Sequence, residues 1–464
     1  MTINIPNRKL NDFNTPIKIY RGCMGSGKTY STLEELNPEV QTLFVTEKLD
    51  LIDDAAEISP HLYIPKAKPK KSKHLFELLK SGKSCAITHK LFSMIDSQTV
   101  FLIKELGVNC IIDELLENTV QLRGLPSERN SGTEDNPHID SSIRLLLNGL
   151  SVLEIDKKTN QVSWNSFKYP KPQNAGILTD LYTWANNGCL FWYNQDNDSE
   201  GHDLSGYVVT TLPVNILTAF KSIGILCYGF EGLPLEGYMK LFNIPYEFDD
   251  RFLNEEEDNL KALREKIIIV HDSNIYKYLD EEAKKIGKKV GFSMSMTCWD
   301  KLITDSVAKG IGSKLELYMK SNGFRQTDTL WTTYLGHRDR VSKGFTRRVL
   351  NIFGNDNIEK ARKGTVKTFA SFNLKGTNEY KGRKLMMHLC CPHINENLRQ
   401  FFLSRGIRLD NDAYTLEMTR QWIMRGSARD RYSDEVMTCL IASKKARFLL
   451  ADWLNNESSL KKVA

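Results

Sequence analysis

Short apolar runs alternate with longer mixed stretches over the first 118 residues of the chain. The runs cover residues 17–20, 42–46, 84–88 and 108–112, and polar residues follow each of them. Short runs of this kind, separated by helical spacers, are typical of parallel strands in β-α-β units. Residues 30–36 contain no helix breaker and are expected to form a helix. The pattern predicts an α/β domain built on a parallel sheet.

The composition changes after residue 120. Residues 120–205 are first turn-rich and then rich in Asn, Trp and Tyr, without a strong period, so we interpret them as an insertion or accessory subdomain. The α/β alternation returns at residues 207–210 and 223–228. The first lobe, residues 1–250, is therefore expected to carry an insertion.

A second change marks the boundary between two domains. The segment 249–265 is acidic and polar, and it precedes a new apolar run at residues 267–270. A chain of 464 residues is also too long for a single hydrophobic core. We therefore predict a linker over residues 251–265 and a second α/β lobe over residues 266–464.

The overall composition is that of a soluble globular protein, with 41% hydrophobic and 26% charged residues. Apolar runs fall far short of the roughly 20 residues that a membrane span needs, and the polar N-terminus shows no signal peptide. The nine cysteines lack the spacing of a zinc site or a disulfide scaffold. These features predict free thiols, a cytoplasmic location and no membrane partner.

Positive charge is concentrated in one part of the chain. The net charge is only +6, but residues 307–348 contain nine Lys or Arg against three acids. Such a stretch is either a surface that binds a polyanion or a solvated, lysine-rich helical face. The sequence leaves both interpretations open.

Residues 22–29 read G-C-M-G-S-G-K-T, a complete phosphate-binding loop between a predicted strand and a predicted helix. The glycines allow backbone N–H groups to wrap a triphosphate, and the start of a helix favours the anion. Lys28 is expected to reach the β- and γ-phosphates, and the Thr29 hydroxyl to ligate Mg²⁺. The candidate nucleotide-binding residues are Gly22, Gly25, Ser26, Gly27, Lys28 and Thr29. ATP and Mg²⁺ are the expected cofactors.

An acidic pair follows the apolar run at residues 108–112. A P-loop ATPase needs one acid at the end of a neighbouring strand to hold Mg²⁺ and a second to activate the attacking water. Asp113 suits the first role and Glu114 the second. An apolar run followed by two acids is weak evidence alone, but it is strong in the same predicted sheet as a phosphate loop.

Together with the phosphate loop, residues 113–116 (D-E-L-L) resemble the D-E-x-x box of superfamily 2 helicases and translocases. Residues 43–48, 86–90 and 374–380 resemble further motifs of that family. The resemblance implies nucleic-acid contacts at Thr46, Thr88, His89, Thr377 and Asn378. The coupling motif of the family has no clear match, and residues 209–211 and 226–230 are its two candidates.

Residues 421–430 (Q-W-I-M-R-G-S-A-R-D) resemble the sixth motif, Q-x-x-G-R-x-x-R, which implies an arginine finger. Two departures leave its identity open between Arg425 and Arg429. Met424 replaces the glycine of the family, and Arg429 lies four rather than three positions after Arg425. Arg429 is slightly favoured, and Gln421 is the remaining candidate catalytic residue. The T-N-E-Y and Q-W-x-x-R elements also resemble a group of helicases from bacteriophages and mobile elements.

The resemblance implies two RecA-like α/β lobes that hydrolyse ATP between them. The expected function is an ATP-dependent helicase or translocase in phage-type replication or recombination, acting on single-stranded or forked DNA. Replication proteins are candidate partners, and a phage-encoded protein would work in the bacterial host cytoplasm. The alternatives are an ATP-gated DNA clamp, loader or remodeller without unwinding, and a packaging-type ATPase. Polarity, DNA or RNA preference, preferred junction and oligomeric state are left open.

Overall fold

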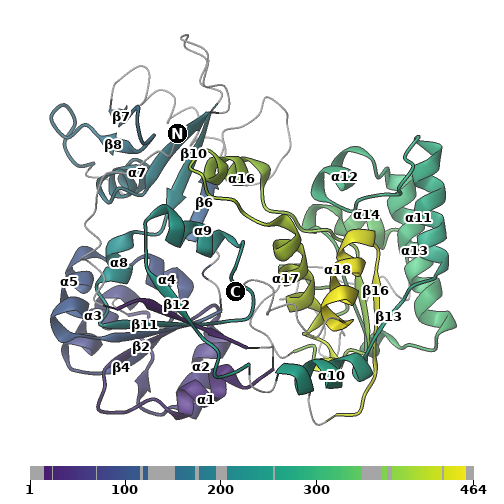
Figure 1. Ribbon diagram of the computed structural model, residues 1–464, viewed down its shortest axis with the longest axis horizontal. Helices are drawn as coiled ribbons and strands as arrows, with labels where there is room; N and C mark the ends of the chain where they lie inside the picture. Colours follow the sequence, from purple (N-terminus) through teal and green to yellow (C-terminus); the bar gives the residue numbers. More distant parts are fainter. Residues whose placement is uncertain are drawn as a thin grey trace. The chain divides into compact units, whose positions relative to one another are not determined.

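The computed structural model of the protein divides into two compact units. Unit 1 comprises Met1–Tyr20, Thr29–Asp249 and Ile394–Asp410, and unit 2 comprises Arg21–Lys28, Asp250–His393 and Asn411–Ala464. The structure describes residues 15–22, 25–68, 70–114, 116, 119–123, 152–172, 177–194, 206–253, 256–346, 367–373, 379–430 and 433–455. Figure 1 shows the helices and strands of each unit.

A seven-stranded sheet forms the centre of unit 1. Its strands are β1 (Ile17–Arg21), β2 (Thr42–Thr46), β3 (Leu62–Tyr63), β4 (Ser84–Thr88), β5 (Asn109–Asp113), β11 (Ser222–Cys227) and β12 (Tyr246–Asp249). The strand order is β12-β1-β11-β5-β2-β4-β3. The pairs β1–β12, β11–β5, β5–β2, β2–β4 and β4–β3 are parallel. The parallel α/β domain predicted from the sequence is therefore confirmed.

Helices lie on both faces of this sheet (Figure 1). They are α1 (Lys28–Glu34), α2 (Leu49–Ile58), α3 (Lys71–Lys80), α4 (His89–Ser93), α5 (Ser97–Leu106), α8 (Val214–Thr218) and α9 (Pro234–Leu241). All five residues of β2 are buried, as expected for a strand covered on both faces. On one face, Phe44 packs in a cluster with Leu33 of α1 and Ile52 of α2.

A smaller antiparallel module, here called the accessory module, is inserted between β5 and β11. Its elements are β6 (Val120–Arg123), β7 (Leu153–Ile155), β8 (Val162–Trp164), α7 (Ile177–Asn186), β9 (Leu190–Asn194) and β10 (Gly206–Thr211). β10 pairs antiparallel with β6 and β9, and β7 pairs antiparallel with β8. The module has its own core around Trp164, Leu181 and Trp192. The run at 207–210 is thus a strand, but of this antiparallel sheet, because apolar periodicity does not specify a strand's partners.

The segment Ile394–Asp410 returns from unit 2 to unit 1, a crossing that two consecutive lobes would not require. It contains α16 (Glu396–Leu403), which contacts β6. Phe401 meets Phe191 of β9 edge-on, with ring centroids 5.9 Å apart. The buried Arg405 donates to the Thr159 carbonyl at 3.3 Å, which ties the segment to the accessory module.

Unit 2 is built on a four-stranded parallel sheet of order β13-β16-β15-β14. Its strands are β13 (Ile267–Ile269), β14 (Thr329–Thr332), β15 (Leu385–His388) and β16 (Met437–Ile441). Its helices are α10 (Glu256–Lys266), α11 (Asn274–Lys285), α12 (Met296–Lys301), α13 (Asp305–Ser321), α14 (Arg338–Ser342), α17 (Asn411–Ile423) and α18 (Lys444–Asn455), with 3₁₀ turns η4 (Gln326–Asp328), η5 (Leu335–His337) and η7 (Ser427–Arg429). Most of the predicted linker 251–265 belongs to α10.

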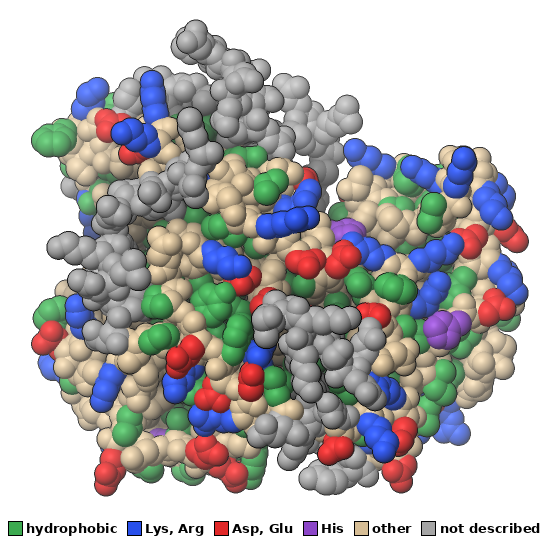
Figure 2. Space-filling model, in the orientation of Figure 1, with side chains coloured by type: hydrophobic (Ala, Val, Ile, Leu, Met, Phe, Trp, Pro, Cys, Tyr) green, Lys and Arg blue, Asp and Glu red, His purple; other side chains and the backbone are tan. Residues whose placement is uncertain are grey.

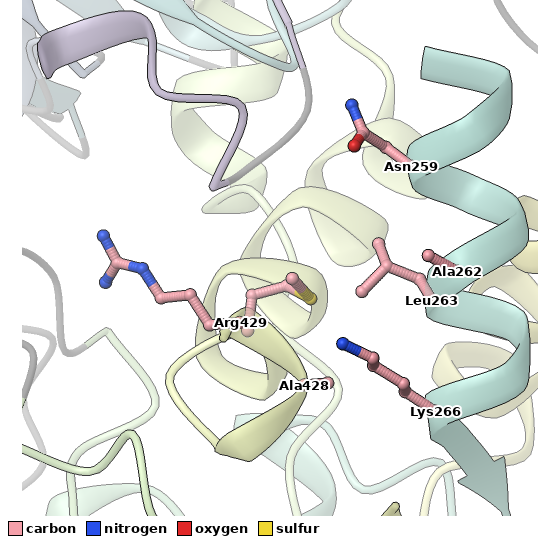
Figure 3. Close-up of a pocket in the computed structure, with 7 residues that line it drawn as sticks. Asn259, Ala262, Leu263, Lys266, Ala428 and Arg429 are labelled. Atoms are coloured by element: carbon pink, nitrogen blue, oxygen red, sulfur yellow. The ribbon is translucent and has the colours of Figure 1, made fainter. Parts of the chain in front are cut away.

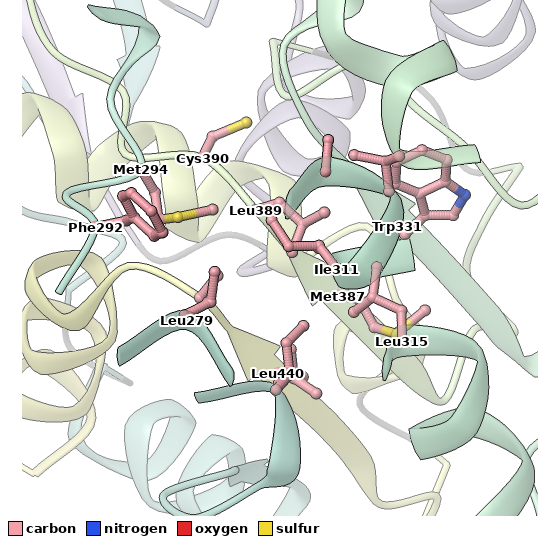
Figure 4. Packing of buried hydrophobic residues seen from close by; sticks show 14 of the residues in the cluster. Leu279, Phe292, Met294, Ile311, Leu315, Trp331, Met387, Leu389, Cys390 and Leu440 are labelled. Carbon is pink, nitrogen blue, oxygen red and sulfur yellow. The ribbon is translucent and has the colours of Figure 1, made fainter. Parts of the chain in front are cut away.

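The core of unit 2 lies where α11 and α13 cover this sheet. Ile311 and Leu315 of α13 pack near Trp331 of β14 and Met387 of β15, as Figure 4 shows. Trp331 and Met387 are fully buried. Among the described helices of both units, none combines the length and apolar composition that a membrane span needs.

Candidate nucleotide-binding site

The phosphate loop follows β1, and glycine is required at several of its positions. Gly25 and Gly27 have φ angles of +77° and +79°, a backbone region that residues with a Cβ rarely adopt. Gly22 is close-packed, because a Cβ there would lie 2.7 Å from Phe252 Cβ and 3.0 Å from Lys28 Cδ. The three glycines that the sequence selected therefore shape the loop.

Two side chains of the loop suit a bound phosphate. The Lys28 ammonium donates to the Gly22 carbonyl, so it reaches back across the loop towards its first residue. The Ser26 hydroxyl oxygen is buried and has no hydrogen-bond partner among the described residues. A phosphate oxygen in the loop could accept from both groups, which is the geometry expected of a triphosphate site.

The predicted metal ligands are in direct contact. The Thr29 hydroxyl of α1 donates to Asp113 Oδ1 at the end of β5, at 2.7 Å. Asp113 is 9% exposed. A hydroxyl and a carboxylate are hard oxygen ligands that suit Mg²⁺, which usually completes its shell with water and phosphate oxygens. Within the described part of the chain, no group of three or more His, Cys, Asp or Glu could hold a metal by itself. The pair therefore fits a magnesium ion brought in with a nucleotide.

Glu114 follows on a strained backbone. Its φ angle is +67°, unusual for a residue with a side chain, and its N–H donates to the Leu226 carbonyl of β11 at 3.0 Å. Strain of this kind persists where the surroundings fix it and is concentrated at functional sites. The backbone therefore leaves the extended conformation at Glu114, directly after Asp113 ends β5.

β11 lies between the strands that carry the phosphate loop and the acidic pair. Its end and the residues after it, 226–230, consequently lie at the same sheet edge as Thr29 and Asp113, since Leu226 is the register partner of Asp113. The alternative candidate for the coupling motif, 209–211, belongs to the antiparallel accessory module. The sheet order therefore favours 226–230.

The candidate nucleic-acid residues of unit 1 lie beside the acidic pair. His89 Nε2 is 3.1 Å from the Asp113 carbonyl oxygen. Thr88 caps α4 by accepting from the Leu91 N–H at 3.2 Å. Thr46 is buried, and its hydroxyl has no hydrogen-bond partner among the described residues. The contact of His89 with Asp113 was not expected from the sequence. Thr377 and Asn378 lie outside the described residues.

In unit 2, Gln421 and Arg425 are buried at the end of α17 and just after it. Gln421 Nε2 donates to Glu417 Oε1 at 2.7 Å, and the other carboxylate oxygen of Glu417 accepts from Arg420. Glu417 thereby fixes the Gln421 amide so that its oxygen is left as an acceptor. Nothing in the sequence pattern indicates Glu417 for this positioning role, because an acid one helical turn before a glutamine is common.

Arg429 is partly exposed, on η7, and lies beside the phosphate loop. A Cβ on Gly25 would be 3.5 Å from the Arg429 carbonyl and 3.9 Å from its Cγ. Arg429 is one of the residues that line a cavity of about 90 Å³, together with Asn259, Leu263 and Lys266. Figure 3 shows the end of the Arg429 side chain pointing away from these three residues. That cavity is too small for a nucleotide, since ligand pockets measure roughly 300 Å³ or more.

One polar site escaped the sequence analysis. Ser273 precedes α11 and is only 9% exposed, and its hydroxyl has no partner among the described residues. It lines a cavity of about 280 Å³ together with Lys277, Lys314 and Asp272, whose carboxylate lies 3.4 Å from Lys277 Nζ. The helix start, the buried hydroxyl and Lys314 suit a phosphate group, and Asp272 offsets the charge of Lys277. A Ser-Asn pair after the apolar run 267–270 was the available signal.

Several charges of the basic stretch 307–348 have structural roles. Arg340 donates to Asp305 Oδ1 at 2.6 Å and to the carbonyls of Trp299 and Ile303. Lys320 pairs with the buried Glu316. The described part of the stretch is therefore partly a set of internal ion pairs, and Arg347 and Arg348 lie outside the described residues.

Comparison with known proteins gives one family match and one curated relative. Residues 262–454 match the family model of the YonV C-terminal Rossmann-like domain. The second unit is similar to a Rossmann-like domain. The SPbeta prophage-derived uncharacterized protein YonV of Bacillus subtilis (strain 168) is 23% identical over 466 residues, which cover 95% of this chain and 99% of the relative.

Helicases are found among the solved structures with weak similarity. A structure named XPD_Helicase aligns with a TM-score of 0.46 at 13% identity, covering 95% of both chains. Xpd4 of S. tokodaii aligns with a TM-score of 0.47 at 13% identity, covering 97% of this chain and 96% of the other. The helicase domain of Pyrococcus furiosus Hef aligns with a TM-score of 0.35 at 8% identity, covering 94% and 95%.

Proposed function

We propose that the protein is an ATP-dependent nucleic-acid helicase or translocase, with DNA as the favoured substrate. The observation that carries the proposal is the hydrogen bond between Thr29 and Asp113, at the end of a complete phosphate loop. A threonine and an aspartate 84 positions apart meet where a magnesium ion would accompany a triphosphate. The alternative, a Gly-rich surface turn that binds no ligand, does not account for the contact between Thr29 and Asp113.

In this proposal each residue has a defined task. Lys28 binds the β- and γ-phosphates, and Thr29 and Asp113 hold Mg²⁺, which neutralises charge on the phosphates when bound. Glu114 orients the attacking water and accepts its proton. Arg429 of unit 2 supplies the guanidinium that stabilises the transition state, and its position beside Gly25 supports it over Arg425. Gln421, held by Glu417, is a second polar group from the same segment.

Nucleic acid is proposed to contact both units through its phosphates. In unit 1 the candidates are Thr46, Thr88 and His89, and in unit 2 they are Thr377, Asn378 and the site at Ser273. His89 supports a link between the two activities, because the residue that contacts the strand would also touch the backbone of Asp113. Contacts of this type carry little base specificity and weaken as salt is added.

The relative is named as prophage-derived, which supports a phage-type setting in a bacterial cytoplasm. The role that we propose there is replication or recombination. Replication proteins are then the natural partners. The alternatives are an ATP-gated clamp, loader or remodeller and a packaging-type ATPase. The poor match to the coupling motif favours the clamp among them, whereas no cluster of metal-binding acids among the described residues supports a nuclease domain of the packaging type.

The distinguishing experiment is strand displacement from a forked DNA duplex with ATP and Mg²⁺. A helicase releases the labelled strand, and the Lys28→Ala variant does not. A translocase that does not unwind displaces a bound streptavidin block from single-stranded DNA instead. ATP turnover without strand release and without streptavidin displacement would favour the clamp or loader. The absence of ATP turnover in the presence of every nucleic acid tested would contradict the proposal.

A further inference from the structure

The accessory module displays a phenylalanine ring that has no part in the nucleotide site. Phe167 lies in the turn after β8 and has a relative exposure of 105%, as much as in an isolated peptide. Large aromatic side chains are normally at least half buried in a folded domain. A single exposed apolar residue needs no explanation by itself. The structure of the turn that carries the ring is therefore needed to argue for a binding role.

The turn that carries Phe167 is held by hydrogen bonds on both sides of the ring. Trp164 Nε1 donates to the Tyr169 carbonyl at 2.9 Å, which closes the turn around Phe167. Asn165 Oδ1 accepts from the Lys168 N–H at 3.2 Å, and Asn165 Nδ2 donates to Glu154 Oε1 at 2.7 Å. The ring is thus presented to solvent by a fixed backbone, and a partner that binds it has little conformational entropy to overcome.

The base of the turn is anchored in the core of the module. Trp164 is 8% exposed and meets Tyr182 of α7 edge-on, with ring centroids 5.4 Å apart. Asn165 N–H also donates to the Val152 carbonyl at 2.8 Å. These contacts fix the turn to the β7–β8 hairpin, so the exposed ring is part of a rigid element.

The hairpin that carries the ring also carries more lysines than acids. Between residues 152 and 172 there are four lysines, all exposed, against two acids. Lys168 and Lys171 follow Phe167 in the sequence, and Lys157 and Lys158 lie at the other end of the hairpin, on the order of 10 Å along a three-residue ladder. Figure 2 shows blue side chains and a protruding green one at the corner where Figure 1 labels β7 and β8.

The two acids reduce the charge of this segment to a net +2. Asp156 accepts from the backbone N–H groups of Thr159 and Lys158 at 3.0 and 2.7 Å, which holds its pKa below the usual range and keeps the carboxylate ionised. Glu154 accepts from Asn165, as described above. The surface therefore offers one aromatic face and several cations, the combination by which proteins bind single strands: bases stack on rings and phosphates pair with lysines.

We propose that the β7–β8 hairpin is a binding element for single-stranded nucleic acid, in which Phe167 stacks on an unpaired base and the four lysines pair with phosphates on either side. This proposal rests on the proposed function and deepens it, because the accessory module would bind part of the nucleic-acid strand. A duplex hides its base faces, so the element prefers single strands and would hold a strand already opened.

The test is equilibrium binding, by fluorescence anisotropy, of an oligothymidylate and of an abasic oligodeoxynucleotide of equal length. We expect Phe167→Ala to weaken oligothymidylate binding about 5- to 100-fold, the range of one lost base stack, and to leave abasic binding unchanged. Phe167→Trp should restore binding. Leu178→Ala is the matched control, because Leu178 is an exposed apolar residue of α7 in the same module.

The lysines give a second, independent readout. A Lys157→Ala/Lys158→Ala double variant should weaken both oligomers and lower the slope of log K against log salt by about 0.7 for each lost phosphate contact. Oligothymidylate binding that is equal in Phe167→Ala and the wild type would overturn this inference while leaving the proposed function intact. Equal weakening of both oligomers by Phe167→Ala would overturn it too. Wild-type protein that binds no nucleic acid would end both proposals.

Discussion

The hydroxyl of Thr29 and the carboxylate of Asp113 are joined by a hydrogen bond of 2.7 Å. Thr29 lies on the first turn of α1, directly after the phosphate loop. Asp113 ends β5, which is two strands from β1 in the sheet of unit 1. Neither residue needs the other for the fold, since α1 and β5 are each held by their own hydrogen bonds and packing. We propose that the two side chains share a ligand, and the first prediction follows from this proposal.

Thr29→Val removes the hydroxyl and keeps the shape of the side chain. We expect Mg²⁺ to support ATP turnover only at about 10- to 100-fold higher concentration, the usual loss when a metal-orienting contact is removed. The measurement is a magnesium titration of the ATPase rate. Thr42→Val is the control, because Thr42 is a buried threonine of β2 at the opposite end of the strand from the site. The same magnesium dependence in both variants would contradict a ligand role for Thr29.

Glu114→Gln separates binding from chemistry. The amide cannot accept the proton of the attacking water, so turnover should fall by at least about 100-fold while ATP still binds. Lys28→Ala should instead lose ATP binding itself, because the phosphates lose their principal cation. Binding of a fluorescent ATP analogue and steady-state turnover distinguish the two. Substantial turnover in Glu114→Gln would remove this residue from the reaction.

The two arginines of residues 421–430 should differ in effect. Arg429→Ala and Arg429→Lys should both lower kcat by about 10³-fold or more with little change in KM, because a lysine lacks the planar guanidinium geometry. Arg425 is buried, so Arg425→Ala should act mainly through stability and lower the Tm. Equal and mild effects on kcat would show that neither is an arginine finger.

His388 should make unit 2 sensitive to acid. It is fully buried beside Trp422, and burial lowers its pKa from 6.5 to about 3. Between pH 6.5 and 3, His388 is protonated in the unfolded chain but stays neutral in the folded unit. The free energy of unfolding should therefore fall by about 1.4 kcal/mol for each pH unit in this range. Urea unfolding followed by tryptophan fluorescence at pH 7 and 5.5 measures this. His388→Gln should show a smaller loss, and an identical loss would contradict the assignment.

The local pattern predicted the parts of the site that are close together along the chain or at strand ends. The phosphate loop and the Asp113-Glu114 pair were found because apolar runs mark strands, and the carboxyl ends of parallel strands share one edge. The contact of His89 with Asp113 depends on the order of strands in the sheet, which the runs do not specify. The return of residues 394–410 to unit 1 was missed for a similar reason. Arg405 and Phe401 find their partners more than 200 positions away, in a module with no clear period.

The exposure of Phe167 could not be predicted from the sequence either. In the sequence it is one aromatic residue among many, and aromatic residues usually indicate a core. Only the structure distinguishes the buried Trp164 from Phe167, three positions later, because the direction of each side chain depends on the turn between them.

ATP turnover with Mg²⁺, measured with and without single-stranded DNA, single-stranded RNA and duplex DNA, tests the central claim most directly. The account predicts a low basal rate, strong stimulation by one single-stranded nucleic acid, weaker stimulation at higher salt, and loss of both rates in Asp113→Asn. A rate that is unchanged by every nucleic acid would contradict it, and the absence of any turnover would remove the ATPase as well.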